Sequence, residues 1–292
     1  MLVEFGGKQY DPATTTQIKC SRKAITDLSP LARLPNLARL KLDNIGATDL
    51  SPLAALAHLT ELSLVKSAVT DLRPLANLPL RKLAVADTRI DDATPLASFR
   101  ALRELPLGST KIRDAAPLAA LADLEYLSLD RVYISDLAFV ESLAKLRELR
   151  LGWTQVLDLA PLARVRSLVV LDLGHAPFLI HEPFRNFDAI GTLARLEALN
   201  LCDAKVGRDL TPLSRLTALR RVTLERTDLT DLAVLTPLAA LEFLDINRNP
   251  IRDFEPLAAL ARLRWLYLYD VPITDDQLAW FARALPGCKL TR

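Results

Sequence analysis

A seven-residue phrase recurs along this chain. TDLSPLA stands at residues 26–32 and again at 48–54, 22 residues later. Its core, Asp-Leu-x-Pro-Leu, returns with small changes in segments that begin at Asp27, Asp49, Asp71, Asp92, Asp114, Asp158, Asp209 and Asp253. Asp136 and Asp231 begin segments that keep the frame without the proline. A unit this short cannot bury its own apolar residues, so the chain must fold as a stack of similar units.

A second motif, LxxLxL, runs in register with the first. It begins at Leu37, Leu59, Leu80, Leu102, Leu124, Leu146, Leu168, Leu196, Leu219, Leu241 and Leu263. Alternation of apolar and outward residues predicts a short strand that is buried on one face. The Asp that follows can accept backbone N–H bonds in a turn, and Pro suits the first helical position. Each unit is therefore predicted to be a strand, a turn, a short helix and a turn.

These letters and this spacing resemble the leucine-rich repeats of the internalin type, a bacterial class with a 22-residue unit. The resemblance covers roughly residues 17 to 290. It implies an α/β leucine-rich-repeat solenoid: a curved horseshoe with a parallel concave sheet and short α or 3-10 helices on its convex side. One feature departs from the class, because the Asn that usually follows LxL occurs only as Asn249. We expect threonine hydroxyls to replace some of the missing hydrogen bonds.

The boundaries follow from the repeats. We expect a single leucine-rich-repeat domain over 1–292, with an N-terminal hairpin and capping repeat at 1–36 and eleven repeats at 37–274. The hairpin turns at Gly6-Gly7, and the repeat at 168–195 is longer. Residues 275–292 read as a capping helix and strand, with Asp275 or Asp276 as N-cap and Gly287 as the stop. The extra residues of the long repeat lie at 177–187. Two readings stay open: a protruding recognition loop, or a tolerated insertion that packs Phe178, Phe184 and Phe187 onto the core.

Charge and composition limit the partners. Lys plus Arg total 37 against 35 Asp plus Glu, so the net charge of +2 offers no general attraction for nucleic acid. No early stretch has the form of a signal peptide and no stretch is apolar enough to span a bilayer, so we expect a cytoplasmic chain without membrane insertion. Cys20, Cys202 and Cys288 are odd in number and far apart, which favours reduced thiols. We expect a monomer.

No catalytic or cofactor motif is present. The chain lacks phosphate-binding loops, nucleophile elbows and HExxH. His175 and His181 flank the insertion near Glu182, but without a known ligand spacing, so no metal and no cofactor are predicted. Cys202 is at an outward strand position without an identifiable base, which makes it a bystander.

The concave face carries the remaining signal. Alternation places aromatic and Arg side chains on it or at its rim: Tyr126, Arg150, Trp153, His175, Phe243, Arg248, Trp265, Tyr267 and Tyr269. Exposed aromatics beside Arg are typical of protein interfaces. The alternative is that the aromatics only pair with one another. Gly108, Gly152 and Gly174 would let a partner backbone approach.

The sequence therefore predicts a non-catalytic recognition module that binds a protein partner through its concave face. Two alternatives stay open. One is a secreted or delivered bacterial effector or adhesion protein, and the other is the substrate-recognition piece of an enzyme complex.

Overall fold

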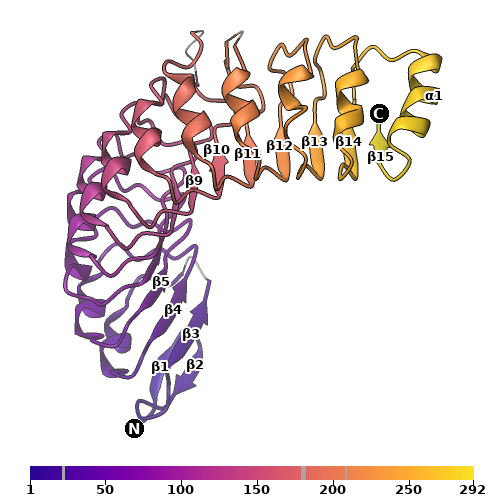
Figure 1. Ribbon diagram of the computed structural model, residues 1–292. Helices are drawn as coiled ribbons and strands as arrows, with labels where there is room; N and C mark the ends of the chain where they lie inside the picture. Colours follow the sequence, from indigo (N-terminus) through magenta and orange to yellow (C-terminus); the bar gives the residue numbers. More distant parts are fainter. Residues whose placement is uncertain (22–23, 179–181, 208) are drawn as a thin grey trace. The chain divides into compact units, whose positions relative to one another are not determined.

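The computed structural model describes residues 1–292 apart from 22–23, 179–181 and 208. Contacts divide the chain into two compact units, Met1–Leu146 and Arg147–Arg292. Each unit contains a parallel sheet with helices on one side, and each is described here by itself (Figure 1). The prediction of one domain over 1–292 stays a prediction.

The first unit begins with an antiparallel hairpin, β1 (Val3–Phe5) and β2 (Lys8–Tyr10). Its parallel strands are β3 (Gln17–Cys20), β4 (Arg39–Leu42), β5 (Glu61–Ser63), β6 (Lys82–Ala84), β7 (Glu104–Pro106) and β8 (Tyr126–Ser128). Between them lie the 3-10 helices η1 (Ser29–Arg33), η2 (Ser51–Ala55), η3 (Arg73–Leu75), η4 (Thr94–Ser98) and η5 (Ala116–Ala120), and η6 (Ala138–Ser142) follows β8.

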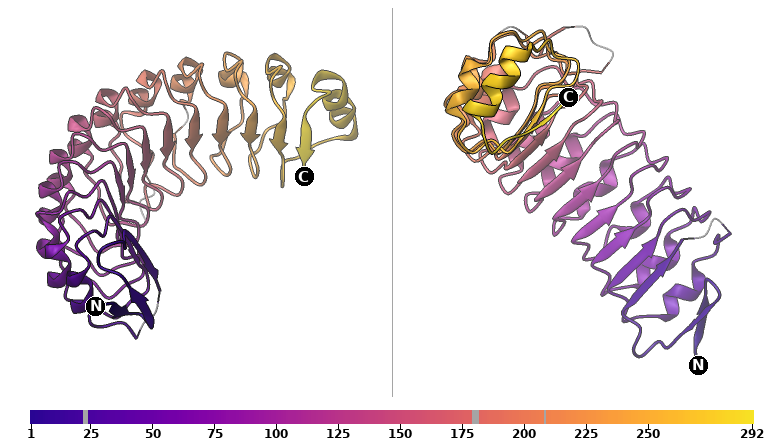
Figure 2. Two further views of the ribbon diagram at one scale, coloured as in Figure 1. Left: turned by 90° about the horizontal axis from the view of Figure 1, so that it is seen from below. Right: turned by 90° about the vertical axis from the view of Figure 1, so that its right-hand side faces the viewer.

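The second unit repeats this plan. Its parallel strands are β9 (Glu148–Arg150), β10 (Val170–Asp172), β11 (Ala198–Asn200), β12 (Arg221–Thr223), β13 (Phe243–Asp245), β14 (Trp265–Tyr267) and β15 (Lys289–Thr291). Its 3-10 helices are η7 (Ala160–Arg164), η8 (Phe187–Thr192), η9 (Thr211–Arg215), η10 (Ala233–Leu235) and η11 (Glu255–Ala259), and one α-helix, α1 (Asp275–Ala284), stands between β14 and β15. Figure 2 shows α1 at the C-terminal end of this unit.

Neighbouring strands pair at equivalent repeat positions, such as Leu40 with Leu62 and Leu171 with Leu199. The leucines of LxxLxL are buried, so they form an apolar layer between the sheet and the helices. The side chains between them point to solvent and form what we call the strand face of each unit. The predicted leucine-rich-repeat solenoid is confirmed.

The recurring Asp closes a turn, as its position predicts. The Asp27 carboxylate accepts the backbone N–H of Ser29 at 2.8 Å, and the same bond recurs in later units, as from Ser51 to Asp49 at 2.8 Å. These hydrogen bonds lower the pKa of Asp27 and Asp49 because they stabilise the charged form. The Asp is thus a structural residue of the turn.

Hydroxyl groups replace the missing asparagines in part. Thr88, Thr154 and Thr227 each donate a hydrogen bond to the carbonyl three residues earlier, at 2.7–2.8 Å. Thr110 differs, because its buried hydroxyl has no hydrogen-bond partner among the described residues. At this position Asn249 alone has an amide side chain. This amide forms hydrogen bonds with backbone groups of its own repeat and of the repeat before it.

One residue after each strand of the repeats has a left-handed backbone, with φ between 53° and 62°. We call these rim residues: Asn44, Lys66, Asp87, Ser109, Arg131, Trp153, His175, Asp203, Arg226, Arg248 and Asp270. The left-handed conformation suits Asn and Asp and disfavours bulky side chains. Trp153 is therefore a costly choice for the turn.

The two caps agree with the prediction in outline. Gly6 and Gly7 have φ of 59° and 77°, which the two-residue hairpin turn requires. The N-cap of α1 is Thr274, so the prediction of Asp275 or Asp276 is wrong: Thr274 and Gln277 form a reciprocal capping box that fits the turn better. The helix ends at Ala284 with Leu285 as its C-cap, and Gly287 does not take the left-handed conformation of a helix stop.

The helices of the described residues are short. The longest, α1, has ten residues, and none combines the length and apolar character that a bilayer crossing requires.

Candidate binding surface on the strand face

Four aromatic side chains, Phe243, Trp265, Tyr267 and Tyr269, lie on or just after β13 and β14 of the second unit. Phe243 and Tyr267 pack across the strands with ring centroids 5.2 Å apart, and the Arg248 guanidinium lies 5.3 Å from the Tyr269 ring centroid. The alternative of mutual aromatic pairing is met by Phe243 with Tyr267, and among the described residues no ring pair joins Trp265, Tyr267 and Tyr269 with one another. Trp265 remains 41% exposed and Tyr269 remains 54% exposed. A partly uncovered aromatic strip remains on the strand face.

A second aromatic cluster lies at the rim, near β9 and β10. The Trp153 indole stacks on the His175 ring with centroids 4.1 Å apart, and it contacts Phe178 at 5.1 Å. Trp153 is 36% exposed. Trp153 and His175 were both predicted partner-binding residues, and the structure brings them into contact.

A hollow of about 260 Å³ lies on the strand face of the same unit. It is lined by Arg150, Val170, Leu171, Asp172, Ala198, Leu199, Asn200, Arg221, Thr223 and Phe243. The small side chains of Val170 and Ala198 leave this space between the longer Arg150, Arg221 and Phe243. Arg150 and Phe243 were predicted partner-binding residues, and Phe243 joins the hollow to the aromatic strip.

Tyr126 is the one predicted site residue in the first unit. It is half-buried on β8, where its side chain points to the strand face. The remaining predicted residues all belong to the second unit.

Gly174 was predicted to let a partner backbone approach the sheet, and the structure gives it another role. This residue is buried, and a Cβ on it would lie 2.9 Å from the Asn200 amide nitrogen. That amide and the Gly174 backbone N–H both donate to the Asp172 carboxylate, each at 2.9 Å. Gly174 therefore makes room for a side chain of the chain itself. Gly152 is buried as well, so the prediction that a partner backbone approaches at these two glycines is wrong.

Carboxylates gather toward the C-terminal ends of β11 to β13. Glu225 pairs with Arg248 at 2.9 Å, and Asp203 pairs with Arg226 at 3.1 Å. Burial, and then the nearby Glu225 charge, raise the pKa of Asp245. Negative charge is thus crowded on this part of the strand face.

Cys202 lies within this acidic region. Burial, followed by the charges of Glu225 and Asp203, raises the pKa of its thiol to about 12. At neutral pH the thiol is therefore protonated, and it lacks the thiolate character that a nucleophile needs.

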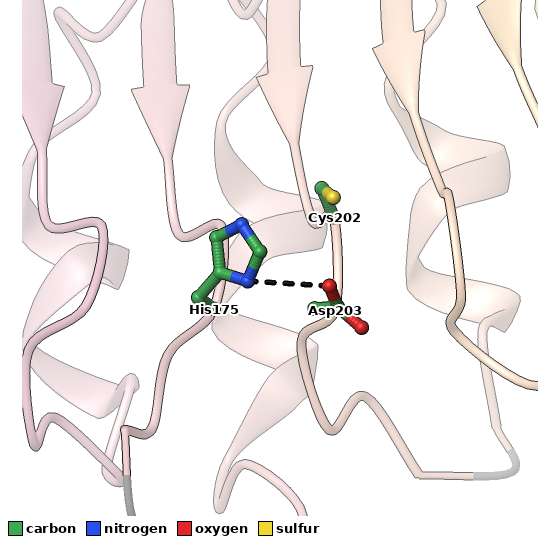
Figure 3. Close-up of side chains that lie close together, drawn as sticks. All are labelled: His175, Cys202 and Asp203. Atoms are coloured by element: carbon green, nitrogen blue, oxygen red, sulfur yellow. Dashed lines mark ion pairs between the residues drawn. The ribbon is translucent and has the colours of Figure 1, made fainter.

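His175, Cys202 and Asp203 form a cluster that the sequence interpretation missed. Their nearest N, S and O donor atoms all lie within 4.8 Å of one another, and His175 Nδ1 lies 3.3 Å from Asp203 Oδ2 (Figure 3). The expectation that Cys202 has no base beside it is wrong. His175 and Asp203 hold the same rim position in consecutive units, and Cys202 precedes Asp203. Residues at equivalent positions of consecutive repeats lie side by side. The sequence could therefore have predicted the contact between His175 and Asp203 from their repeat positions.

The insertion at 177–187 packs onto the repeats where the structure describes it. Phe184 and Phe187 are buried, and Phe178 is half-buried against Trp153. The Phe184 N–H donates to the Lys205 carbonyl at 2.8 Å, which ties the insertion to the next unit. The packing interpretation therefore holds for these residues, whereas His181 lies outside the described residues.

Comparison with solved structures supports the fold. An internalin (InlF) of Listeria monocytogenes superposes with a TM-score of 0.86 at 25% sequence identity, over 97% of this chain and 83% of that one. The structure of a TLR13–ssRNA13 complex matches with a TM-score of 0.70 at 19% identity, over 90% of this chain and 40% of that one, and shows the fold alone. No family model and no curated protein matches the sequence.

The fold and the periodic strand face define a leucine-rich-repeat protein. Its 22-residue units, 3-10 helices and likeness to InlF make it a leucine-rich-repeat protein of the internalin type.

Proposed function

We propose that the chain is a non-catalytic recognition module that binds a protein partner through the strand face of its second unit. The observation that carries the proposal is the continuity of the hollow with the aromatic strip. Phe243 lines the hollow and packs on Tyr267, while Trp265 and Tyr269 stay exposed beside it. Contiguous exposed apolar surface marks interaction sites on soluble proteins.

The chemistry of the surface fits a protein partner. Trp, Tyr and Arg are the residues that most often dominate the binding energy of interfaces. The hollow is lined by Val170, Ala198 and Phe243 and by polar side chains that include Arg221 and Asp172, so it fits an apolar side chain with a polar neighbour. Acidic and basic side chains alternate on this surface, as in the Asp203–Arg226 and Glu225–Arg248 pairs, so it lacks the single positive sign that a phosphate backbone requires.

The rim cluster adds a second argument. Trp153 and His175 occupy the left-handed rim position that every repeat shares, so their side chains lie at the edge of the strand face. An exposed Trp held in such a position, and stacked on a His, is suited to contact a partner.

A non-catalytic role is supported by the state of Cys202. Cys202 lies beside His175, yet burial and the nearby carboxylates raise the pKa of its thiol to about 12. Turnover of a hydrolase or transferase substrate that one strand-face substitution abolishes would contradict this part of the proposal.

The experiment has two stages. The folded chain is first used to capture partners from a lysate of its source cell, and each captured protein is then purified. Isothermal titration compares the wild-type chain with Trp153→Ala and Tyr267→Ala, and each variant is expected to weaken binding by at least about 1–2 kcal/mol.

The controls are exposed Arg residues away from the strand face. Arg33 ends η1, and Arg262 lies in the turn after η11; both are exposed. Arg33→Glu and Arg262→Glu are expected to change affinity little. Loss of binding in this pair, with wild-type binding in the two aromatic variants, would show that the partner binds elsewhere.

A further inference from the structure

His175, Cys202 and Asp203 present three kinds of metal-binding donor to one point at the rim of the second unit. An imidazole nitrogen, a thiol sulfur and a carboxylate oxygen lie within 4.8 Å of one another. The residues come from two consecutive turns, after β10 and after β11 (Figure 3). We propose that these three side chains bind a divalent zinc ion between the two turns.

The donor set selects zinc over other divalent cations. Mg²⁺ and Ca²⁺ prefer cages made of oxygen ligands alone, whereas Zn²⁺ accepts nitrogen, sulfur and oxygen together. Tetrahedral bonds of about 2.0–2.3 Å place zinc ligands about 3.3–3.8 Å apart. The spacing of 3.3 Å between His175 Nδ1 and Asp203 Oδ2 already meets this requirement. The Cys202 sulfur lies within 4.8 Å of both of these atoms.

The surroundings position the ligands. Trp153 stacks on the His175 imidazole and holds the plane of its ring. Arg226 Nη1 donates to both oxygens of the Asp203 carboxylate at 3.1 Å, so the guanidinium orients this ligand and shares its charge. Outer partners of this kind fix ligand direction and tune affinity.

Access and charge are suitable for a cation. The His175 and Asp203 side chains are 31% and 23% exposed, so an ion can enter from solvent. The Glu225 carboxylate lies 3.6 Å from the Cys202 sulfur. It adds negative charge beside the site, although Arg248 pairs with its other oxygen. Three protein ligands leave one zinc position open, for water or for Glu225.

A bound ion would link two neighbouring turns. His175 lies before the insertion of the longest repeat, and Asp203 lies in the next repeat, after η8. The zinc ion would therefore connect the two ends of the lengthened segment. Any ligand that binds the folded chain and not the unfolded one raises its stability. Zinc is therefore expected to raise the melting temperature of the wild-type chain.

The test uses the full chain without an affinity tag. Metal binding displaces the proton of the Cys202 thiol, so the bound sulfur is a thiolate. Titration with Zn²⁺ alone is expected to show one site, and Co²⁺ as a probe is expected to give visible ligand-field bands with a thiolate-to-cobalt charge-transfer band. Cys202→Ser and Asp203→Asn are each expected to weaken Zn²⁺ binding about tenfold or more. Circular dichroism confirms that each variant is folded.

The other two cysteines provide the matched control. The double variant Cys20→Ser/Cys288→Ser leaves Cys202 as the only thiol, and it is expected to keep both zinc binding and the charge-transfer band. This arm decides the question even if Cys202→Ser does not fold. Absence of zinc binding by the wild-type chain, or loss of the charge-transfer band in the double variant, would overturn the proposal.

Discussion

Asn249 offers the sharpest test of how the turns of the second unit are held together. Its side-chain oxygen accepts the backbone N–H of Thr227 at 3.1 Å and that of Leu229 at 3.0 Å. Its amide nitrogen donates to the carbonyls of Leu224 and Ile246 at 2.7 and 3.0 Å. Asn249 is 2% exposed, so water does not replace these bonds without rearrangement. We expect Asn249→Ala to destabilise the unit strongly.

The magnitude follows from the groups left without a partner. The N–H groups of Thr227 and Leu229 belong to buried residues and would both lose their acceptor. The Leu224 carbonyl would lose the hydrogen bond from Asn249 but would keep the one from the Thr227 hydroxyl at 2.8 Å, so it would remain hydrogen-bonded. A buried polar group left unsatisfied costs about 1–3 kcal/mol, so the two N–H groups give about 2–6 kcal/mol.

Urea denaturation followed by tryptophan fluorescence measures this cost, because Trp153, Trp265 and Trp280 all lie in the second unit. The matched control is Thr227→Val, which removes one hydroxyl hydrogen bond and is expected to cost less than Asn249→Ala. A loss below about 1 kcal/mol in Asn249→Ala would refute the reasoning, because the asparagine would then be replaceable by solvent.

Three further predictions follow from single residues. Leu127 is fully buried in the first unit, so Leu127→Ala is expected to cost about 2–5 kcal/mol in urea denaturation, and wild-type stability would contradict the assigned register. Thr110→Val removes a buried hydroxyl without a partner among the described residues, so thermal denaturation is expected to show unchanged or higher stability. The Asp49 pKa lies below its ordinary value of 3.8, so its contribution is present above that pH and is lost as pH falls through the folded-state pKa. Asp49→Ala is therefore expected to lower the melting temperature at pH 7 and to match wild type in strong acid.

The repeat made most of the fold predictable. A fixed period of LxxLxL and Asp-x-x-Pro-Leu gives strand direction, register and the buried layer, because each unit meets the same neighbours. Local chemistry was less predictable where two residues compete for one role. Thr274 and Asp275 are both suitable N-caps, and only the reciprocal bond with Gln277 decides between them.

The candidate site was predictable as a list of outward side chains but not as a surface. Alternation placed Phe243, Trp265 and Tyr267 outward, and the structure shows them outward on adjacent strands. The hollow depends on the shortness of Val170 and Ala198, which no alternation pattern reveals. The grouping of His175 with Cys202 spans a lengthened repeat, so spacing in the chain hid a contact that repeat position would have shown.

Footprinting of the complex tests the central claim most directly. Hydroxyl radicals oxidise exposed aromatic side chains, so the wild-type chain is treated alone and with a partner obtained by affinity capture. The account predicts that oxidation of Trp153, Trp265 and Tyr269 falls in the complex. Tyr133, which is 48% exposed in the turn after β8, provides the internal control and should react unchanged. Protection of Tyr133 with unchanged oxidation of the other three would contradict recognition through the strand face.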